Sequence, residues 1–262
     1  MSKSPISVFI VTLNEEKNIE RALRSVSFAD EVIVVDSGSS DNTVALAENM
    51  GANVIFNEWP GYAKQKQFAM QLCKHDWVLN LDADEEITNE LARKYQSLVN
   101  QDKYVSVRCT RDDLFIGQKM SSWTKKPNNN RLYRKSLSNF DISRYVHESA
   151  DVDGKEIFIK ESLTHYGYGS IEVLTHKNNQ YSSLKAQEKF SKNKPYSLIK
   201  LVTIFPLIFI KEYLFQRKLF SGVRGFTLSI MLAYYAFIKE AKLYELHHIS
   251  TQEHDKKNKD ES

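Results

Sequence analysis

Apolar residues in the first hundred positions follow two alternating patterns. Short, mostly apolar runs lie at residues 6–11, 32–35, 53–56 and 77–81. Between them, apolar side chains recur at the three- and four-residue spacing of a helix, in segments near residues 19–26, 42–51, 63–72 and 91–98. Unbroken apolar strands that alternate with amphipathic helices are typical of a parallel sheet covered on both faces. We therefore predict an α/β fold, with Asn14 as the cap of its first helix.

The pattern becomes less regular after residue 105. Short strand-like segments lie at residues 105–109, 131–134 and 156–160, separated by polar loops such as KKPNNN. We expect this region to extend the same sheet.

The C-terminal region contains two uncharged apolar runs, at residues 201–210 and 226–238. Ten and thirteen residues are too few to cross a bilayer core, which needs about 20. Basic residues flank and separate the runs: Lys200, Lys211, Arg217, Lys218, Arg224, Lys239 and Lys242. This arrangement favours amphipathic helices in a membrane interface, with packing on the catalytic domain or on a second subunit as the alternative. The polar tail from His247 lacks periodicity, and we expect it to be disordered.

Composition and charge exclude few classes of protein but point away from nucleic acid. The 262 residues are 42% hydrophobic and 26% charged, as in soluble globular proteins. The net charge is only +3, and the basic residues interleave with apolar runs, so DNA is not the expected partner. Cys73 and Cys109 match no metal-binding spacing and are predicted to be buried and reduced. The N-terminus shows no signal-peptide pattern, which favours the cytoplasm.

Polar side chains follow each of the predicted strands. They are Thr12, Asn14 and Glu15 after the first strand, Asp36 after the second, Lys64 beyond the third, and Asp82 and Asp84 after the fourth. Each has a purely structural explanation as a helix cap, a turn residue or a solvated side chain. Ligands nevertheless bind outside the carboxyl ends of parallel strands, so together these residues predict a binding site.

The stretch DADEE at residues 82–86 packs four carboxylates behind an apolar strand. The sequence has neither a GxGxxG turn nor a P-loop, so a nucleotide diphosphate would need its charge neutralised by other means. Two carboxylates two residues apart, here Asp82 and Asp84, can hold a hard cation that bridges phosphate oxygens. We therefore predict a site for Mg²⁺ or Mn²⁺ carrying a nucleotide diphosphate.

Three segments, ISVFIVTLNEEKNIERALRSV, EVIVVDSGSSDNTVALAE and WVLNLDADEEI, resemble the nucleotide-sugar motifs of family 2 inverting glycosyltransferases, which have the GT-A fold. GYAKQKQFAMQLCKHDWVLNLDADEEI, the later RLYRKS and YVHESADVDG, and the basic, aromatic C-terminal region more narrowly resemble the WaaE/KdtX group. Enzymes of that group add a β-linked glucose to the heptose of the lipopolysaccharide inner core.

This resemblance implies a role for each matched residue. Thr12, Asn14 and Glu15 would line the nucleoside pocket, and Asp36 would bind the uracil or the ribose. Lys64 would approach the diphosphate. Asp82 would contact the ribose or the donor sugar, and Asp84 would ligate the metal.

The residues after the nucleotide half supply candidates for the rest of the chemistry. Glu148 in YVHES is the expected general base, with Asp141, Asp151 and Asp153 as competitors. His147 would orient Glu148 or bind the metal, and His165 would be a metal or diphosphate ligand. Arg131 and Arg134 would hold phosphates of the leaving diphosphate or of a lipid acceptor. The alternative that these histidines and arginines are ordinary surface residues stays open.

The resemblance predicts a metal-dependent hexosyltransferase that moves a sugar from a UDP-sugar, expected to be UDP-glucose, onto a lipid-linked lipopolysaccharide core. The predicted segments are a nucleotide-sugar-binding half (residues 1–104), an acceptor half (105–194), membrane-associating helices (195–246) and the tail (247–262). The expected location is cytoplasmic, peripheral on the inner face of the cytoplasmic membrane, and a homo-oligomer is left open. The alternatives are a transferase that loads a sugar onto a polyprenyl phosphate, and a non-catalytic sugar-nucleotide-binding membrane scaffold.

Overall fold

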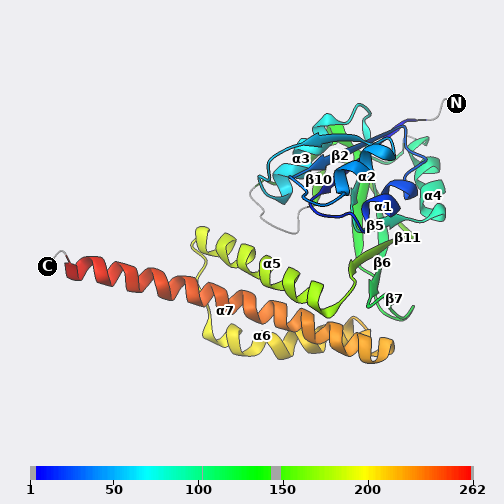
Figure 1. The fold of residues 1–262 in the computed structure, drawn as a ribbon. Helices are drawn as coiled ribbons and strands as arrows, with labels where there is room; N and C mark the ends of the chain where they lie inside the picture. Colours follow the sequence, from blue (N-terminus) through cyan, green and yellow to red (C-terminus); the bar gives the residue numbers. More distant parts are fainter. Residues whose placement is uncertain (1–3, 102, 143–148, 261–262) are drawn as a thin grey trace. The chain divides into compact units, whose positions relative to one another are not determined.

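The chain divides into two compact units in a computed structural model that describes residues 4–101, 103–142 and 149–260 (Figure 1). The first unit comprises Met1–Leu114 and Lys126–Gly167, and the second comprises Phe115–Lys125 and Tyr168–Ser262. The boundary predicted between residues 194 and 195 therefore falls inside the second unit. The reason is that α5 (Ile171–Ser191) packs along α7 (Gly222–Asp260).

The N-terminal half of the first unit is a parallel sheet. Its strands are β1 (Ile6–Thr12), β2 (Glu31–Asp36), β3 (Asn53–Phe56) and β4 (Trp77–Asp82), in the order β3-β2-β1-β4. Its helices are α1 (Ile19–Ser25), α2 (Thr43–Asn49), α3 (Tyr62–Leu72) and α4 (Asn89–Val99). The predicted α/β fold with parallel strands is confirmed, because every neighbouring pair in this half is parallel.

Side chains of β1 alternate between two apolar layers, as a strand covered on both faces requires. Ile6, Val8 and Ile10 pack in a cluster that includes buried residues of α1, α2 and α4. Phe9 points to the other face, where it joins residues of α3 and meets Phe140 edge-on, with ring centroids 6.5 Å apart. Burying each of these side chains stabilises the fold by about 1.5–3 kcal/mol.

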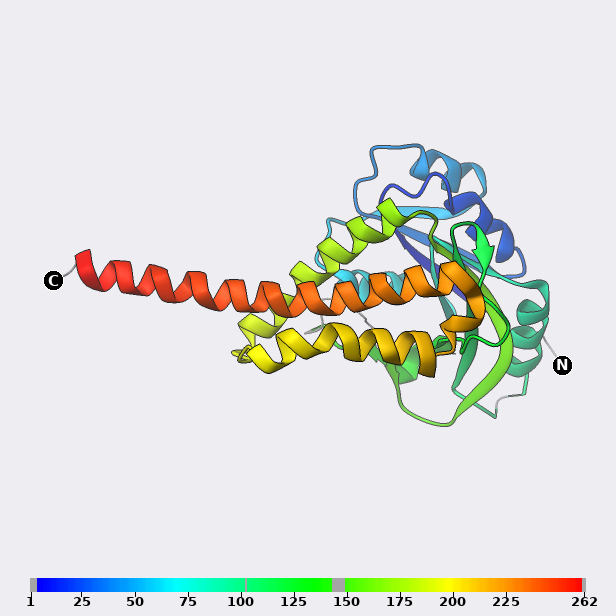
Figure 2. The same ribbon diagram turned by 90° about the horizontal axis from the view of Figure 1, so that it is seen from below.

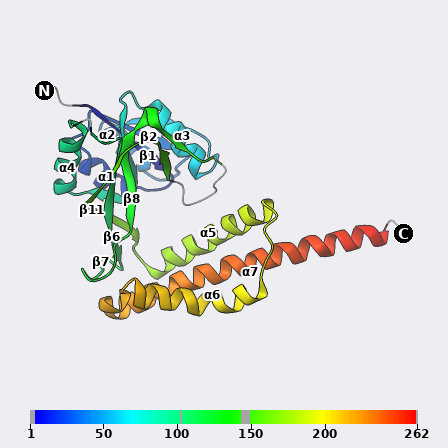
Figure 3. The same ribbon diagram turned by 180° about the vertical axis from the view of Figure 1, so that it is seen from behind.

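The second half of the sheet is antiparallel. It continues from β4 through β8 (Asn128–Arg134), β6 (Ser106–Phe115) and β11 (Glu156–Tyr168) to β5 (Glu85–Ile87). Figure 3 shows β8 and β11 from the reverse side. The three short segments predicted from residue 105 onward overlap β6, β8 and β11. After η1 (Lys135–Leu137), β9 (Ser138–Phe140) and β10 (Ala150–Val152) form a separate antiparallel pair.

The prediction that Asn14 caps the first helix is wrong. Helix α1 begins only at Ile19, and Asn14 adopts a left-handed conformation with φ of 56°. Its side-chain carbonyl instead accepts a hydrogen bond from the backbone N–H of Ser40, at 2.9 Å. Asn14 thus joins the loop after β1 to the loop after β2.

The second unit consists mainly of helices. They are α5, α6 (Leu198–Ile210), the π-helical turn η2 (Lys211–Phe215), η3 (Lys218–Ser221) and α7, with the short strand β7 (Gln118–Lys119). Helices α6 and α7 run side by side in Figure 2, and α5 lies along α7 in Figures 1 and 3. Gly225 allows η3 to approach α7, because a Cβ atom there would lie 1.8 Å from the Lys218 carbonyl oxygen.

Helix α7 is longer than the sequence predicts. It continues to Asp260 through the tail expected to be disordered, because no glycine or proline follows Gly225 to end the helix. The stretch Lys218–Ile249, 32 residues long, has the length and composition of a membrane-crossing helix. The uncharged run inside this stretch, residues 226–238, is too short to cross a bilayer on its own.

Candidate functional site

The carboxyl ends of the parallel strands bring three of the predicted residues to one edge of the sheet. Thr12 is the register partner of Asp36 on β2, and Val11 is the partner of Asp82 on β4. Ligands of parallel α/β sheets bind at this edge. The strand-end prediction therefore has a structural basis for Thr12, Asp36 and Asp82.

Asp36 is buried and holds the loop that follows its strand. One carboxylate oxygen accepts hydrogen bonds from the backbone N–H groups of Gly38 and Ser39, both at 2.8 Å. The other accepts from the hydroxyl groups of Thr12, at 3.1 Å, and Ser39, at 2.5 Å. Asp36 thus stabilises the turn after β2, as its structural explanation proposes. Through these bonds Asp36 also holds the loop at the edge of the sheet.

Glu15 and its neighbour Glu16 join the same pair of loops through their backbones. The N–H of Glu15 donates to the Thr43 hydroxyl at 2.8 Å, and the N–H of Glu16 donates to Asp41 at 3.1 Å. Asp41 also accepts a hydrogen bond from the Thr43 N–H, at 3.0 Å. These bonds fix the loops after β1 and β2 relative to each other, which preorganises the wall of the site.

Asp82 lies between two cations. Its Oδ1 atom is 2.8 Å from the Lys66 ammonium, and its Oδ2 atom is 2.7 Å from the Arg131 guanidinium. Burial opposes the ionisation of Asp82, but Arg131 and Lys66 outweigh it and hold the pKa of this carboxyl well below its usual range. One third of the Asp82 side chain stays exposed, so this fixed carboxylate remains open to a ligand.

Arg131 also binds Glu85, which is completely buried. The second carboxylate oxygen of Glu85 accepts the backbone N–H of Asp82 at 3.2 Å. Glu85 therefore neutralises part of the charge of Arg131 from inside the protein and fixes the backbone of the DADEE segment. This role explains one of the four carboxylates that the sequence places there.

Asp84 faces His165. Its Oδ2 atom lies 3.6 Å from Nε2 of His165, while Nδ1 of His165 is 2.9 Å from Oδ1 of Asp113. Burial opposes the charged imidazole, but the hydrogen bonds to Asp113 and Asp84 raise the pKa of His165 to about 9. Asp113 fixes the orientation of the ring, as carboxylates often do for histidines that bind metals through the other nitrogen.

The pairing of β5 with β11 explains why these groups meet. His165 is the register partner of Glu85, and the backbone N–H of Tyr166 donates to the Asp84 carbonyl at 2.8 Å. Gly167 follows on the same strand, where a Cβ atom would lie 2.4 Å from His165 Nε2 and 2.6 Å from Asp84 Oδ2. A side chain at position 167 would therefore occupy the space beside these two groups.

Two of the predicted phosphate-binding residues lie elsewhere. Arg134 contacts Asp76 at 3.1 Å and stacks over Trp77, at the beginning of β4 and thus at the end opposite to Asp82. Lys64 is exposed on the first turn of α3. The predicted base Glu148 and its neighbour His147 lie outside the described residues.

Lys66 and Asp113 also belong to the site, although neither was among the predicted residues. The sequence pattern does indicate that Lys66 is buried, because it falls on the same helical face as Ala63, Ala69 and Met70. A lysine in such a position needs an anionic partner. No local pattern predicts the role of Asp113, because its position beside His165 depends on the pairing of β6 with β11.

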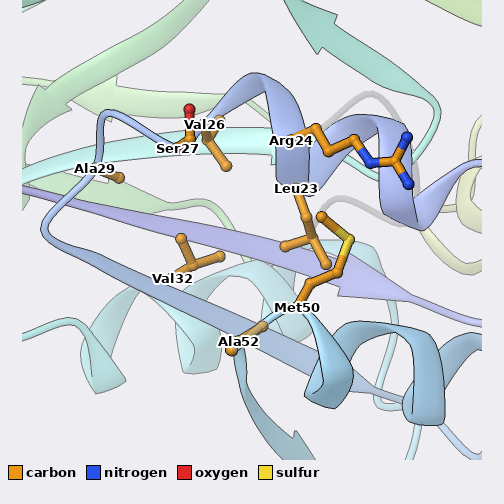
Figure 4. Close-up of a pocket in the computed structure, with 9 residues that line it drawn as sticks. Leu23, Arg24, Val26, Ser27, Ala29, Val32, Met50 and Ala52 are labelled. Carbon is orange, nitrogen blue, oxygen red and sulfur yellow. The ribbon is translucent and has the colours of Figure 1, made fainter.

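A cavity of about 410 Å³ lies at the opposite end of the parallel strands (Figure 4). Leu23, Val26, Val32 and Met50 contribute to its lining, with Arg24 at the α1 side. The lining contains no carboxylate, so this cavity lacks the side chains that would hold a hard metal ion.

Comparison with known proteins identifies the family. The sequence profile of glycosyl transferase family 2 matches residues 7–181, which is more than half of the chain. This chain belongs to glycosyl transferase family 2. The resemblance drawn from the sequence motifs is confirmed, and the strand-end site coincides with the matched region.

Two curated relatives cover almost the whole chain. A glycosyltransferase of Rickettsia typhi, itself uncharacterized, is 39% identical over 254 residues, covering 92% of this chain and 87% of that protein. The lipopolysaccharide core biosynthesis glycosyltransferase LpsC of Rhizobium meliloti is 32% identical over 253 residues and covers 94% of both chains. Among solved structures, TarS of S. aureus aligns with a TM-score of 0.50 and 17% identity, over 92% of this chain and 54% of TarS. The likeness to TarS agrees with the α/β fold of this family 2 glycosyltransferase.

Proposed function

We propose that this family 2 glycosyltransferase is an inverting enzyme that binds a UDP-sugar together with Mg²⁺ or Mn²⁺ at the strand-end site. The observation that carries the proposal is the arrangement of Asp82 and Asp84. Asp82 is held by Lys66 and Arg131 while staying partly exposed, and Asp84 faces His165. The two carboxylates thus serve separate tasks, one directed at a sugar or ribose hydroxyl group and one at a metal ion.

The residues around Asp84 fit a hard divalent cation. Asp84 Oδ2 would be one protein ligand, and Nε2 of His165 would be a second once the cation displaces its proton, with Asp113 fixing the imidazole from behind. Within residues 4–101, 103–142 and 149–249 no group of three His, Cys, Asp or Glu side chains forms a complete metal cage. Mg²⁺ and Mn²⁺ suit such a site, because Mg²⁺ commonly keeps water and substrate phosphates among its ligands. When bound, the cation would stabilise the charge of the departing diphosphate.

The protein's own side chains would position the donor and prepare the displacement. Asp82 would accept a hydrogen bond from a hydroxyl group of the ribose or of the donor sugar. Thr12, Asn14, Glu15 and the loop fixed by Asp36 would surround the nucleoside. A carboxylate of the acceptor half would take the proton of the attacking hydroxyl as its oxygen bonds to the anomeric carbon, which inverts the configuration. Glu148 is the proposed base.

The proposed reaction moves glucose from UDP-glucose to a heptose of the lipopolysaccharide inner core. Support for the acceptor comes from the similarity to LpsC, whose name assigns it to lipopolysaccharide core biosynthesis. A lipid-linked acceptor would be reached from the cytoplasmic side, so we propose a peripheral location on the inner face of the cytoplasmic membrane. The basic and apolar C-terminal helices support this location.

Product analysis tests the proposal directly. The purified chain is incubated with UDP-glucose, UDP-galactose or ADP-heptose and with either a heptose-containing lipid A core or a polyprenyl phosphate. We expect mass spectrometry to show one added hexose on the lipid A core with UDP-glucose, and NMR to show a β-linkage. Asp84→Ala should form no product. Transfer only to the polyprenyl phosphate would overturn the proposed acceptor, and the absence of transfer to any acceptor would favour a non-catalytic protein.

A further inference from the structure

Three lysines from three helices converge on one carboxylate oxygen in the second unit. Oε1 of Glu240 on α7 lies 2.5 Å from the Lys189 ammonium on α5, 3.1 Å from that of Lys200 on α6, and 3.9 Å from that of Lys239. Glu240 itself is buried, with 5% of its surface exposed. A single carboxylate neutralises one of these three charges, so the junction of the helices carries excess positive charge.

Neighbouring residues add to this excess. Lys185 and Lys192 both pair with Glu188, at 2.8 and 3.0 Å. The lysine cluster is defined as Lys185, Lys189, Lys192, Lys200 and Lys239, and among the described residues its five cations pair with the two carboxylates of Glu188 and Glu240. Burial and the neighbouring Lys189 lower the pKa of Lys239 despite Glu240, which is the effect expected where like charges are crowded. Such a cluster is stabilised by an additional anion.

The apolar face of α6 begins beside this cluster. Ile199, Val202, Pro206 and Ile210 recur at helical spacing and are all exposed, with Ile199 at 79% and Val202 at 77%. Lys200 is adjacent to Ile199 in the chain, so the cationic cluster and the apolar face adjoin at the first turn of α6. Figure 2 shows that α6 runs along α7 for its whole length.

We propose that the lysine cluster binds the phosphate group of an anionic phospholipid while the apolar face of α6 rests among the acyl chains of the same leaflet. Lysine ammonium groups carry three donors each and bind phosphate as point charges. The proposal rests on the peripheral membrane location given under the proposed function and names the groups that would hold the lipid, but it concerns a site other than the donor site and does not require the proposed sugar transfer.

The dimensions of α6 suit one leaflet. The uncharged segment between Lys200 and Lys211 has ten residues, or about 15 Å of helix, which is half of the roughly 30 Å hydrocarbon core. Helix α7 is long enough to cross the membrane, but a crossing orientation would place Glu240 and its lysines near hydrocarbon, where charged groups are costly. An orientation parallel to the surface keeps these charges at the level of the headgroups.

A second copy of the chain fits this surface less well than lipid. In a symmetric dimer the same face of each copy pairs with its counterpart. The Lys200 end of α6 in one copy would then lie against the Lys200 end or the Lys211 end of α6 in the other copy. Both arrangements bring like charges together. Anionic headgroups complement the same lysines, and acyl chains adapt to an exposed helix face without a matching shape.

Vesicle flotation of the full chain tests this inference. The probes are vesicles of phosphatidylcholine, with and without phosphatidylglycerol. The variant Lys200→Gln/Lys239→Gln should bind the anionic vesicles about tenfold or more weakly, since each lysine near an anionic surface contributes about 1 kcal/mol. Lys200→Arg/Lys239→Arg keeps the charges and should bind as the natural chain does. Lys94→Gln/Lys160→Gln makes the same charge change in the first unit and should also leave binding unchanged.

A second variant separates the apolar contribution from the charges. Val202→Asp should weaken binding to both kinds of vesicle, while circular dichroism shows unchanged helix content because this side chain is exposed. Equal binding of the glutamine and arginine variants would overturn the lysine cluster as a phosphate site. Binding that does not depend on phosphatidylglycerol, or a dimer that Val202→Asp dissociates without any vesicle binding, would overturn the lipid assignment.

Discussion

The Lys66 ammonium lies 2.8 Å from Asp82 Oδ1, and only 5% of the Lys66 side chain is exposed. A lysine so far from water retains its charge only beside an anion. Lys66 therefore holds the first carboxylate of DADEE from the helix that precedes it, while Arg131 holds it from β8. The pair links the fold to the site, because α3 packs on the sheet with Lys66 in its buried face.

Replacing Lys66 by glutamine should lower stability and weaken nucleotide binding. Asp82 keeps Arg131 as a partner and is partly exposed, so we expect the free energy of unfolding to fall by about 1–3 kcal/mol. Urea denaturation measures this change. The matched control is Lys64→Gln, two residues earlier on the exposed side of the helix, which should change stability by less than about 0.5 kcal/mol. Equal losses in the two variants would contradict a specific role for Lys66.

The same pair of variants tests the predicted role of Lys64. If Lys64 approaches the diphosphate, Lys64→Gln should weaken UDP binding without lowering the free energy of unfolding. Calorimetric titration with UDP separates the two quantities. Unchanged UDP affinity in Lys64→Gln would contradict the predicted role of Lys64 at the diphosphate.

Gly167→Ala should disable the metal site while leaving the protein folded. The added methyl group would lie 2.4 Å from His165 Nε2 and 2.6 Å from Asp84 Oδ2, so it must displace one of these groups. We expect Mn²⁺ affinity to fall by about tenfold or more, by analogy with other disturbances of metal-ligand geometry. Gly169→Ala is the control, because no heavy atom lies within 4 Å of its added Cβ. Equal Mn²⁺ affinities in the two variants would mean that Asp84 and His165 do not bind the ion together.

Asp113→Asn should weaken metal binding without removing a ligand. The carboxylate fixes His165 through Nδ1, and loss of such outer partners typically costs 10–100-fold in affinity, about 1.4–2.7 kcal/mol. Electron paramagnetic resonance of free Mn²⁺ measures the effect. Asp112→Asn provides the control, since the neighbouring Asp112 pairs with Lys126 at 2.6 Å instead. A weaker Mn²⁺ complex in Asp112→Asn than in Asp113→Asn would contradict the proposed role of Asp113.

The two cysteines should not react in the native protein. Burial raises the pKa of Cys73 to about 12, and it also raises the pKa of Cys109. The thiolate is the reactive form, so at pH 8 about one Cys73 thiol in ten thousand is ionised. Iodoacetamide should label neither residue until denaturant is added. Rapid labelling of the native chain at pH 8 would show that one thiol is accessible.

The parallel half of the fold could be predicted from sequence because its signals are local. The four strands lie within one residue of the predicted runs, since β1, β2 and β4 are largely buried and therefore mostly apolar. The strand-end position of Asp36 and Asp82 follows from the same pattern. These predictions needed no knowledge of long-range pairing.

The partners of the site residues could not be predicted in the same way. His165 meets Asp84 only because β5 folds back to pair with β11, some 80 positions later in the sequence. Arg131 and Arg134 are close in sequence, yet only Arg131 reaches Asp82, because Arg134 lies toward the other end of β4. Which of two nearby cations points into a site depends on strand register, and composition does not determine it.

Calorimetric titration with UDP, ADP, GDP and CDP, with and without Mn²⁺, tests the central claim most directly, because that claim is a metal-dependent nucleotide site at Asp84. We expect UDP binding that requires Mn²⁺ and disappears in Asp84→Ala. Mn²⁺-dependent binding of ADP in place of UDP would redirect the donor assignment to an ADP-linked sugar. UDP affinity that is the same with and without Mn²⁺, and the same in Asp84→Ala, would contradict the account.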